Sequence, residues 1–155
     1  MSESSSGGKA VAMNVTSAHL QLVPNESVPF SKLIPEQNIT DRRVRKIIQL
    51  MKEDLSLPTT LASLAEAAEI SPRQLSRLFK AETDYSPMQY LHLMRFEEAC
   101  FLLGSSWLPA KEICLDVGWK DQSNFIHEFR KQKGCTPCEF REKMMAMKNR
   151  VQIYQ

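Results

Sequence analysis

Two stretches of the chain, "SPRQLSRLFKAETDYSP" at residues 71–87 and "DQSNFIHEFRKQKGCTP" at residues 121–137, follow one pattern of residue types. Each begins with a helix-capping residue and carries large apolar residues four and eight positions later. Each then has a residue type that tolerates left-handed backbone, followed by Ser-Pro or Thr-Pro, which starts a further helix. The pattern predicts that one amphipathic helix occurs twice in the chain.

The surrounding sequence predicts helices throughout the chain from Thr40 onward. Apolar residues recur there at helical spacing, with Thr40 as the expected cap of the first helix, and no segment has a convincing strand pattern. The segment from Ser86 to about Leu103 is apolar nearly all round, which predicts a long helix buried between two bodies. In each half, a short helix and a tight turn precede the repeated helix, an arrangement typical of a helix-turn-helix motif.

We therefore predict an all-α fold of about seven helices, in which the long central helix joins two helix-turn-helix subdomains. Residues 1–38 are rich in Ser, Gly, Asn and Pro and predict a mostly irregular tail. The helical domain is expected over residues 39–146, followed by a C-terminal tail at residues 147–155.

Composition favours a soluble globular protein. The chain has 155 residues, of which 43% are hydrophobic and 25% charged, and its formal net charge is only +2. No apolar run approaches the roughly 18 residues of a membrane span, and no signal peptide is recognisable, so we expect a cytoplasmic protein without a membrane partner. Cations concentrate near the C-terminus, where a solvated charged face is one interpretation and a nucleic-acid contact another: Arg130, Lys131, Lys133, Arg141, Lys143, Lys148 and Arg150.

The motif Cys135-Thr-Pro-Cys138 raises the alternative of a metal or redox protein. A zinc site needs about four ligands, and no second Cys pair or paired His is present at ligand spacing. Thr136 and Glu139 instead have the spacing of a capping box at the start of a helix, as do Ser71 with Gln74 and Ser86 with Gln89. We predict no metal and no cofactor. Equimolar zinc binding would favour the alternative.

Three longer segments resemble the DNA-binding domain of the AraC/XylS family of bacterial transcriptional regulators. They are "LASLAEAAEISPRQLSRLFK" at 61–80, "SPMQYLHLMRFEEACFLL" at 86–103 and "AKEICLDVGWKDQSNFIHEFRKQKGCTPCEFR" at 110–141. The resemblance covers about residues 40–145. It implies a transcription factor rather than an enzyme, either complete in itself or the C-terminal part of a longer regulator.

Four positions depart from the family pattern. Glu69 stands where the first turn usually has glycine, and a left-handed backbone there would cost about 1 kcal/mol. Cys114 replaces a usual alanine, which fits a small buried thiol. Pro109 replaces a polar cap, and His127 replaces a frequent arginine, which weakens the expected charge contact of the second repeated helix.

In a helix-turn-helix motif, the second helix enters the major groove and its outward residues contact base edges. The resemblance therefore implies that Arg73, Ser76 and Arg77 read bases in the first half, and that Gln122, Ser123, Asn124 and His127 do so in the second. Phosphate contacts are expected from Lys80, Arg130, Lys131 and Lys133.

Because the two sets of residues differ, the predicted partner is double-stranded DNA with an asymmetric operator, bound by a monomer. RNA polymerase is a second candidate partner. The remaining alternative is a helical interaction module that never contacts DNA, for which Arg73→Ala combined with Asn124→Ala would leave all activity intact.

Overall fold

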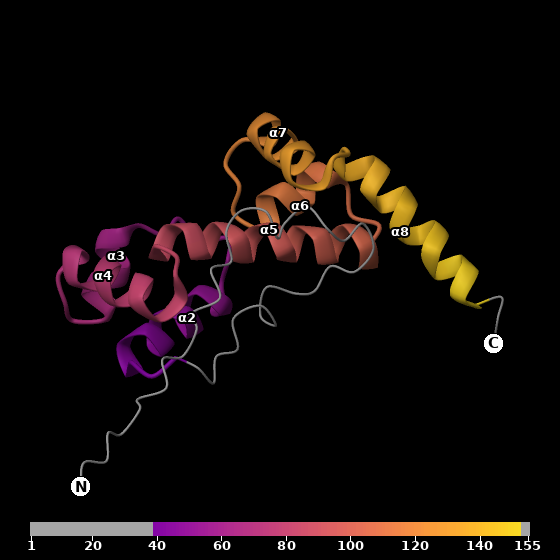
Figure 1. Ribbon diagram of the computed structural model, residues 1–155. Helices are drawn as coiled ribbons and strands as arrows, with labels where there is room; N and C mark the ends of the chain where they lie inside the picture. The colour runs from indigo at the N-terminus through magenta and orange to yellow at the C-terminus, as the bar shows by residue number, and fades with distance from the viewer. Residues whose placement is uncertain (1–38, 153–155) are drawn as a thin grey trace, which may run out of the picture.

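The computed structural model describes residues 39–152, and every regular element in that range is a helix (Figure 1). The all-α prediction is confirmed, whereas the predicted tail at 1–38 lies outside the described residues. None of the helices in 39–152 is long and apolar enough to cross a bilayer. The helices are α2 (Arg42–Glu53), α3 (Leu61–Ala67), α4 (Pro72–Thr83), α5 (Pro87–Ser105), α6 (Ala110–Asp116), α7 (Gln122–Lys133) and α8 (Pro137–Gln152).

Helix α5 is the central rod of the molecule, with α2, α3 and α4 at its N-terminal end and α6, α7 and α8 along the rest of it (Figure 1). Its N-terminal half contributes Tyr90 and Leu91 to one hydrophobic core, and its C-terminal half contributes Phe96 and Leu103 to a second. The predicted burial between two bodies is thus confirmed. Phe101 is an exception, since it is 65% exposed.

Local capping interactions explain where several helices begin. The Gln74 amide nitrogen donates to Ser71 Oγ at 3.3 Å, and the Ser71 amide donates back to Gln74 Oε1 at 3.1 Å, which completes the predicted capping box of α4. Equivalent reciprocal bonds begin α5 and α8. Each box satisfies amide groups that lack a partner within the helix.

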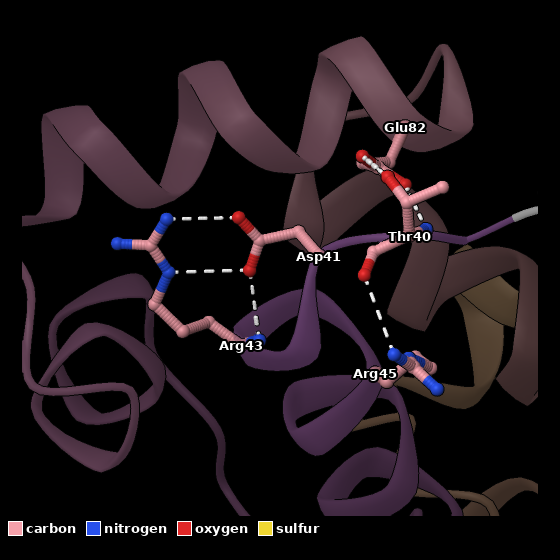
Figure 2. Close-up of polar contacts among 5 residues, drawn as sticks. All are labelled: Thr40, Asp41, Arg43, Arg45 and Glu82. Atoms are coloured by element: carbon pink, nitrogen blue, oxygen red, sulfur yellow. Dashed lines mark hydrogen bonds and ion pairs between the residues drawn. The ribbon is translucent and has the colours of Figure 1, made fainter.

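The first described helix begins differently from the prediction. Its cap is Asp41, whose Oδ1 accepts from the Arg43 amide at 2.8 Å, and not Thr40 (Figure 2). Thr40 instead donates from its amide and hydroxyl to the two carboxylate oxygens of Glu82 on α4, at 2.6 and 2.7 Å. The side-chain hydrogen bond from Arg43 lowers the pKa of Asp41 to about 2. The two bonds from Thr40 to Glu82 connect the residues before α2 to the end of α4.

The last helix continues beyond the predicted domain end at residue 146. Lys148 Nζ on α8 donates to the Gly104 carbonyl on α5 at 2.6 Å, and a Cβ atom on Gly104 would lie 3.6 Å from Met144. Gly104 thus faces α8, and the hydrogen bond from Lys148 supports the additional turns. Helix α8 thus extends to Gln152, into the segment for which the sequence predicted a C-terminal tail.

Candidate DNA-binding surface

The two helix-turn-helix units share one turn geometry. In the first unit the Glu69 amide donates to the Glu66 carbonyl at 2.9 Å, and in the second the Gly118 amide donates to the Leu115 carbonyl at 2.9 Å. Both residues have left-handed backbone, with φ of 57° at Glu69 and 78° at Gly118. Glu69 therefore adopts the left-handed backbone for which glycine is usual, and the first turn has the same shape as the second.

The inner faces of α4 and α7 attach both helices to α5. Phe79 of α4 and Phe129 of α7 are each 0% exposed. The ring centroid of Phe79 lies 5.3 Å from that of Tyr90, and the centroid of Phe129 lies 5.2 Å from that of Phe96. Since Tyr90 and Phe96 both belong to α5, one rigid element carries the two repeated helices.

The outer face of α4 presents cations to solvent. Arg73, Arg77 and Lys80 are exposed, whereas Ser76 is half-buried. Gln74, between the two arginines, uses its carbonyl oxygen in the capping box with Ser71. The predicted base-reading arginines therefore share one exposed face, and Ser76 lies at its edge.

The outer face of α7 presents neutral polar groups instead. Gln122, Ser123, Asn124 and His127 are all exposed. Asp121 Oδ1 accepts from the backbone amides of Ser123 at 2.7 Å and Asn124 at 3.3 Å. Because Asp121 caps the helix alone, the Asn124 side chain is not used in a capping box.

The three cations near the end of α7 have different surroundings. Arg130 is exposed, and Lys131 is also exposed although its Nζ lies 3.9 Å from Glu128. Lys133 Nζ lies 5.8 Å from the ring centroid of Phe96 and 5.9 Å from that of Phe140, at cation–π distance. All three cations are therefore exposed, and the Lys133 ammonium also lies over aromatic rings.

A second basic surface lies on α2, outside the residues predicted as sites. An open hollow of about 510 Å³ is lined by Ile39, Arg42, Arg45, Lys46, Ile48 and Gln49, with no residue of α4 or α7. Lys46 Nζ already donates to the Ala67 carbonyl at the end of α3, at 2.8 Å. The run "RRVRK" at residues 42–46 is the sequence signal for this surface.

Three of the four cysteines pack in the protein interior. Cys100, Cys114 and Cys135 are buried, and Cys138 is exposed. Burial raises the pKa of Cys100 to about 12, so this thiol stays protonated near neutral pH. Cys114 Sγ lies 3.6 Å from the Trp119 carbonyl, to which it donates, in agreement with the predicted small buried thiol. Within 39–152, no three His, Cys, Asp or Glu residues are grouped as metal ligands would be.

Comparison with known proteins gives one consistent relationship. A profile of the helix-turn-helix domain matches residues 64–143. The arabinose operon regulatory protein of Escherichia coli is 32% identical over 102 residues, which cover 65% of this chain and 35% of that protein. The match thus spans about a third of the length of this relative and of several other curated relatives.

Solved structures of other proteins are similar to this chain in fold. The C-terminal domain of AraT, a response regulator from Geobacillus stearothermophilus, matches with a TM-score of 0.63 and 36% identity, covering 66% of this chain and 86% of that one. The DNA-binding domain of AdpA, solved in complex with a target DNA, matches with a TM-score of 0.64 and 25% identity. That match covers 70% of this chain and 96% of the AdpA domain.

Proposed function

Because the chain belongs to the AraC/XylS family of helix-turn-helix regulators, we propose that it controls transcription by inserting α4 and α7 into successive major grooves of one DNA duplex. The family consists of DNA-binding regulators rather than enzymes. One observation carries the proposal: two helices of equal length, anchored on the same rod, have outer faces that are exposed but chemically unlike.

In the proposed complex, α4 reads a guanine-containing half-site. An arginine guanidinium donates two hydrogen bonds to the O6 and N7 atoms of guanine, and such a pair is worth about 1–3 kcal/mol of discrimination. Arg73 and Arg77 have the exposure that this contact needs. Ser76 contacts a base from the edge of the same face. Lys80, near the end of the helix, binds a phosphate and contributes affinity rather than specificity.

Helix α7 reads a different half-site. The amide groups of Gln122 and Asn124 match the donor and acceptor pair on adenine, and Ser123 can bind several base edges. His127 lacks the permanent charge of an arginine and so offers less Coulombic attraction at this position. An arginine-rich α4 and an amide-rich α7 favour an asymmetric operator over a palindrome.

At the half-site that α7 reads, the cations at the end of this helix contact the phosphates. Arg130 and Lys131 are exposed and can track the backbone without reading sequence. Lys133 contributes less, since its ammonium group must leave the rings of Phe96 and Phe140 to reach a phosphate. Release of condensed counterions by these groups makes the affinity depend on salt.

The length of α5 suits two neighbouring grooves. Its 19 residues span roughly 28 Å at about 1.5 Å per residue, compared with roughly 34 Å between successive major grooves on one face of B-DNA. Moderate bending of the DNA removes the difference, at a cost of order 1–6 kcal/mol. One copy of the chain then binds both half-sites. We further propose a cytoplasmic location and RNA polymerase as a protein partner of the bound complex.

Selection of bound duplexes from a random DNA pool tests this function, with Arg77→Ala and Asn124→Ala selected in parallel. The wild-type chain should enrich a bipartite, asymmetric sequence. Arg77→Ala should relax the guanine-containing half only, and Asn124→Ala the other half only. Glu142→Ala, at an exposed position on α8, serves as the control and should enrich the wild-type sequence. If neither the wild type nor the control enriches any sequence, the proposal fails.

A further inference from the structure

Arg95 on α5 connects this helix to the first helix-turn-helix unit by hydrogen bonds. Its Nε donates to the Leu55 carbonyl at 2.9 Å, and its Nη2 donates to the Leu57 carbonyl at 2.8 Å. Both carbonyls belong to the loop between α2 and α3. Two hydrogen bonds from one planar group to two carbonyls of that loop hold it in a single position against α5.

The turn of the second unit contacts the same place. A Cβ atom on Gly118 would lie 2.4 Å from the Leu55 carbonyl oxygen and 3.0 Å from Arg95 Cζ. Gly118 also has φ of 78°, so two independent reasons require glycine there. The α2–α3 loop of the first unit, the Arg95 guanidinium and the α6–α7 turn of the second unit therefore meet at one junction.

Aromatic contacts of Trp119 link the junction to helix α7. Trp119, which follows Gly118, has its ring centroid 4.5 Å from that of His92 on α5 and 5.4 Å from that of Phe125 on α7. Phe125 is fully buried and is one of the anchors of α7. A displacement of the turn at Gly118 would consequently move α7 through the contact between Trp119 and Phe125.

From these contacts we infer that Arg95 and Gly118 are positioning residues that set the separation and angle between α4 and α7, and so the half-site spacing that the chain accepts. The inference rests on the proposed two-groove function. Without Arg95, α5 still connects the two units, but the two hydrogen bonds that hold the α2–α3 loop beside the Gly118 turn are lost. The two half-sites remain readable while the preference for one spacing weakens.

The test compares affinities for the selected operator with duplexes in which one base pair is inserted or removed between the half-sites. Such a change moves one half-site by about 3.4 Å and turns it by about 35°. We expect wild-type affinity to fall about tenfold or more, and Arg95→Met to reduce this penalty to roughly threefold or less. Affinity of Arg95→Met for each half-site alone should stay at the wild-type value. Gly118→Ala should also alter the spacing preference.

Arg141→Lys is the matched control. The Arg141 guanidinium on α8 donates to the Leu108 carbonyl, and both residues belong to the second unit, so this bond does not join the units. We expect Arg141→Lys to keep the full spacing penalty even where it lowers the unfolding midpoint. Circular dichroism melts identify folded variants. If Arg95→Met fails to fold, Arg95→Lys replaces it, because an ammonium group cannot span both carbonyls as the guanidinium does.

The outcomes separate the two proposals. A folded Arg95 variant that keeps the wild-type spacing penalty would overturn the inference while leaving the proposed function intact. A wild-type chain that binds both half-sites but tolerates any spacing would also overturn it. A wild-type chain without specific binding to either half-site would refute the proposed function, and the inference with it.

Discussion

Glycine in place of Glu69 should make the protein more stable, although glycine usually weakens a fold. Glu69 has φ of 57° in the turn between α3 and α4, and its side chain is exposed. Within residues 39–152 its side chain has no hydrogen bond or ion pair with another group. The substitution therefore removes backbone strain and little else.

The size of the effect follows from two opposing contributions. A left-handed backbone costs an ordinary L-residue about 1–2 kcal/mol, and glycine does not incur this cost. Glycine gives the unfolded chain more freedom, which offsets about 0.4–1 kcal/mol of the gain. The net gain in free energy of unfolding is then about 0.5–1 kcal/mol, equivalent to a rise of roughly 2–4 °C in Tm for a domain of this size.

Urea unfolding followed by circular dichroism measures this change, with two controls. Glu69→Ala removes the charge but keeps the Cβ atom, so its stability should equal that of the wild type. Gly134→Ala tests the reverse change, since Gly134 has φ of 68° and a Cβ atom there would meet nothing within 4 Å. It should lose about 0.5–1 kcal/mol. Equal stabilities of Glu69→Gly and Glu69→Ala would refute the strain argument.

Three further predictions concern the core and the titrating groups. Phe129→Ala should lower the free energy of unfolding by about 3–5 kcal/mol in urea, because it empties a fully buried site. Hydrogen bonds from Thr40 lower the pKa of Glu82, so the ionised carboxylate stabilises the fold above the pKa of an ordinary glutamate, and this stabilisation is lost as the pH falls below it. Glu82→Gln should therefore make the free energy of unfolding depend less on pH in the acid range. Burial lowers the pKa of His92; the negative charge of Glu128 opposes this shift, and the positive charge of Arg95 adds to it. The folded state therefore disfavours protonation of His92. Stability should decline as pH drops below about 6.5, and less so in His92→Gln.

The features that the sequence predicted correctly depend mainly on interactions within a few residues. The capping boxes that begin at Ser71, Ser86 and Thr136 join residues three positions apart, so their residue types are visible in any short window. The left-handed positions at Asp84 and Gly134 follow from residue type in the same way. Because these signals occur twice at the same spacing, the repeated helix could be predicted without a structure.

The features that the sequence did not predict depend on distant partners. Thr40 has the residue type of a cap, but its hydrogen-bond partner is Glu82, which is 42 positions away. The position of the Lys133 ammonium likewise depends on the ring of Phe96, which belongs to another helix. The role of Arg95 likewise requires knowledge that Leu55 and Gly118 meet beside it. No local pattern contains this information.

Hydroxyl-radical footprinting of a complex with one chain per selected duplex tests the two-groove account most directly. The account predicts two protected patches on one face of the DNA, separated by about one helical turn of roughly 10 base pairs. Asn124→Ala should weaken protection in one patch and Arg77→Ala in the other. A single protected patch, or protection that appears only when two chains bind, would contradict the claim that one chain reads two grooves.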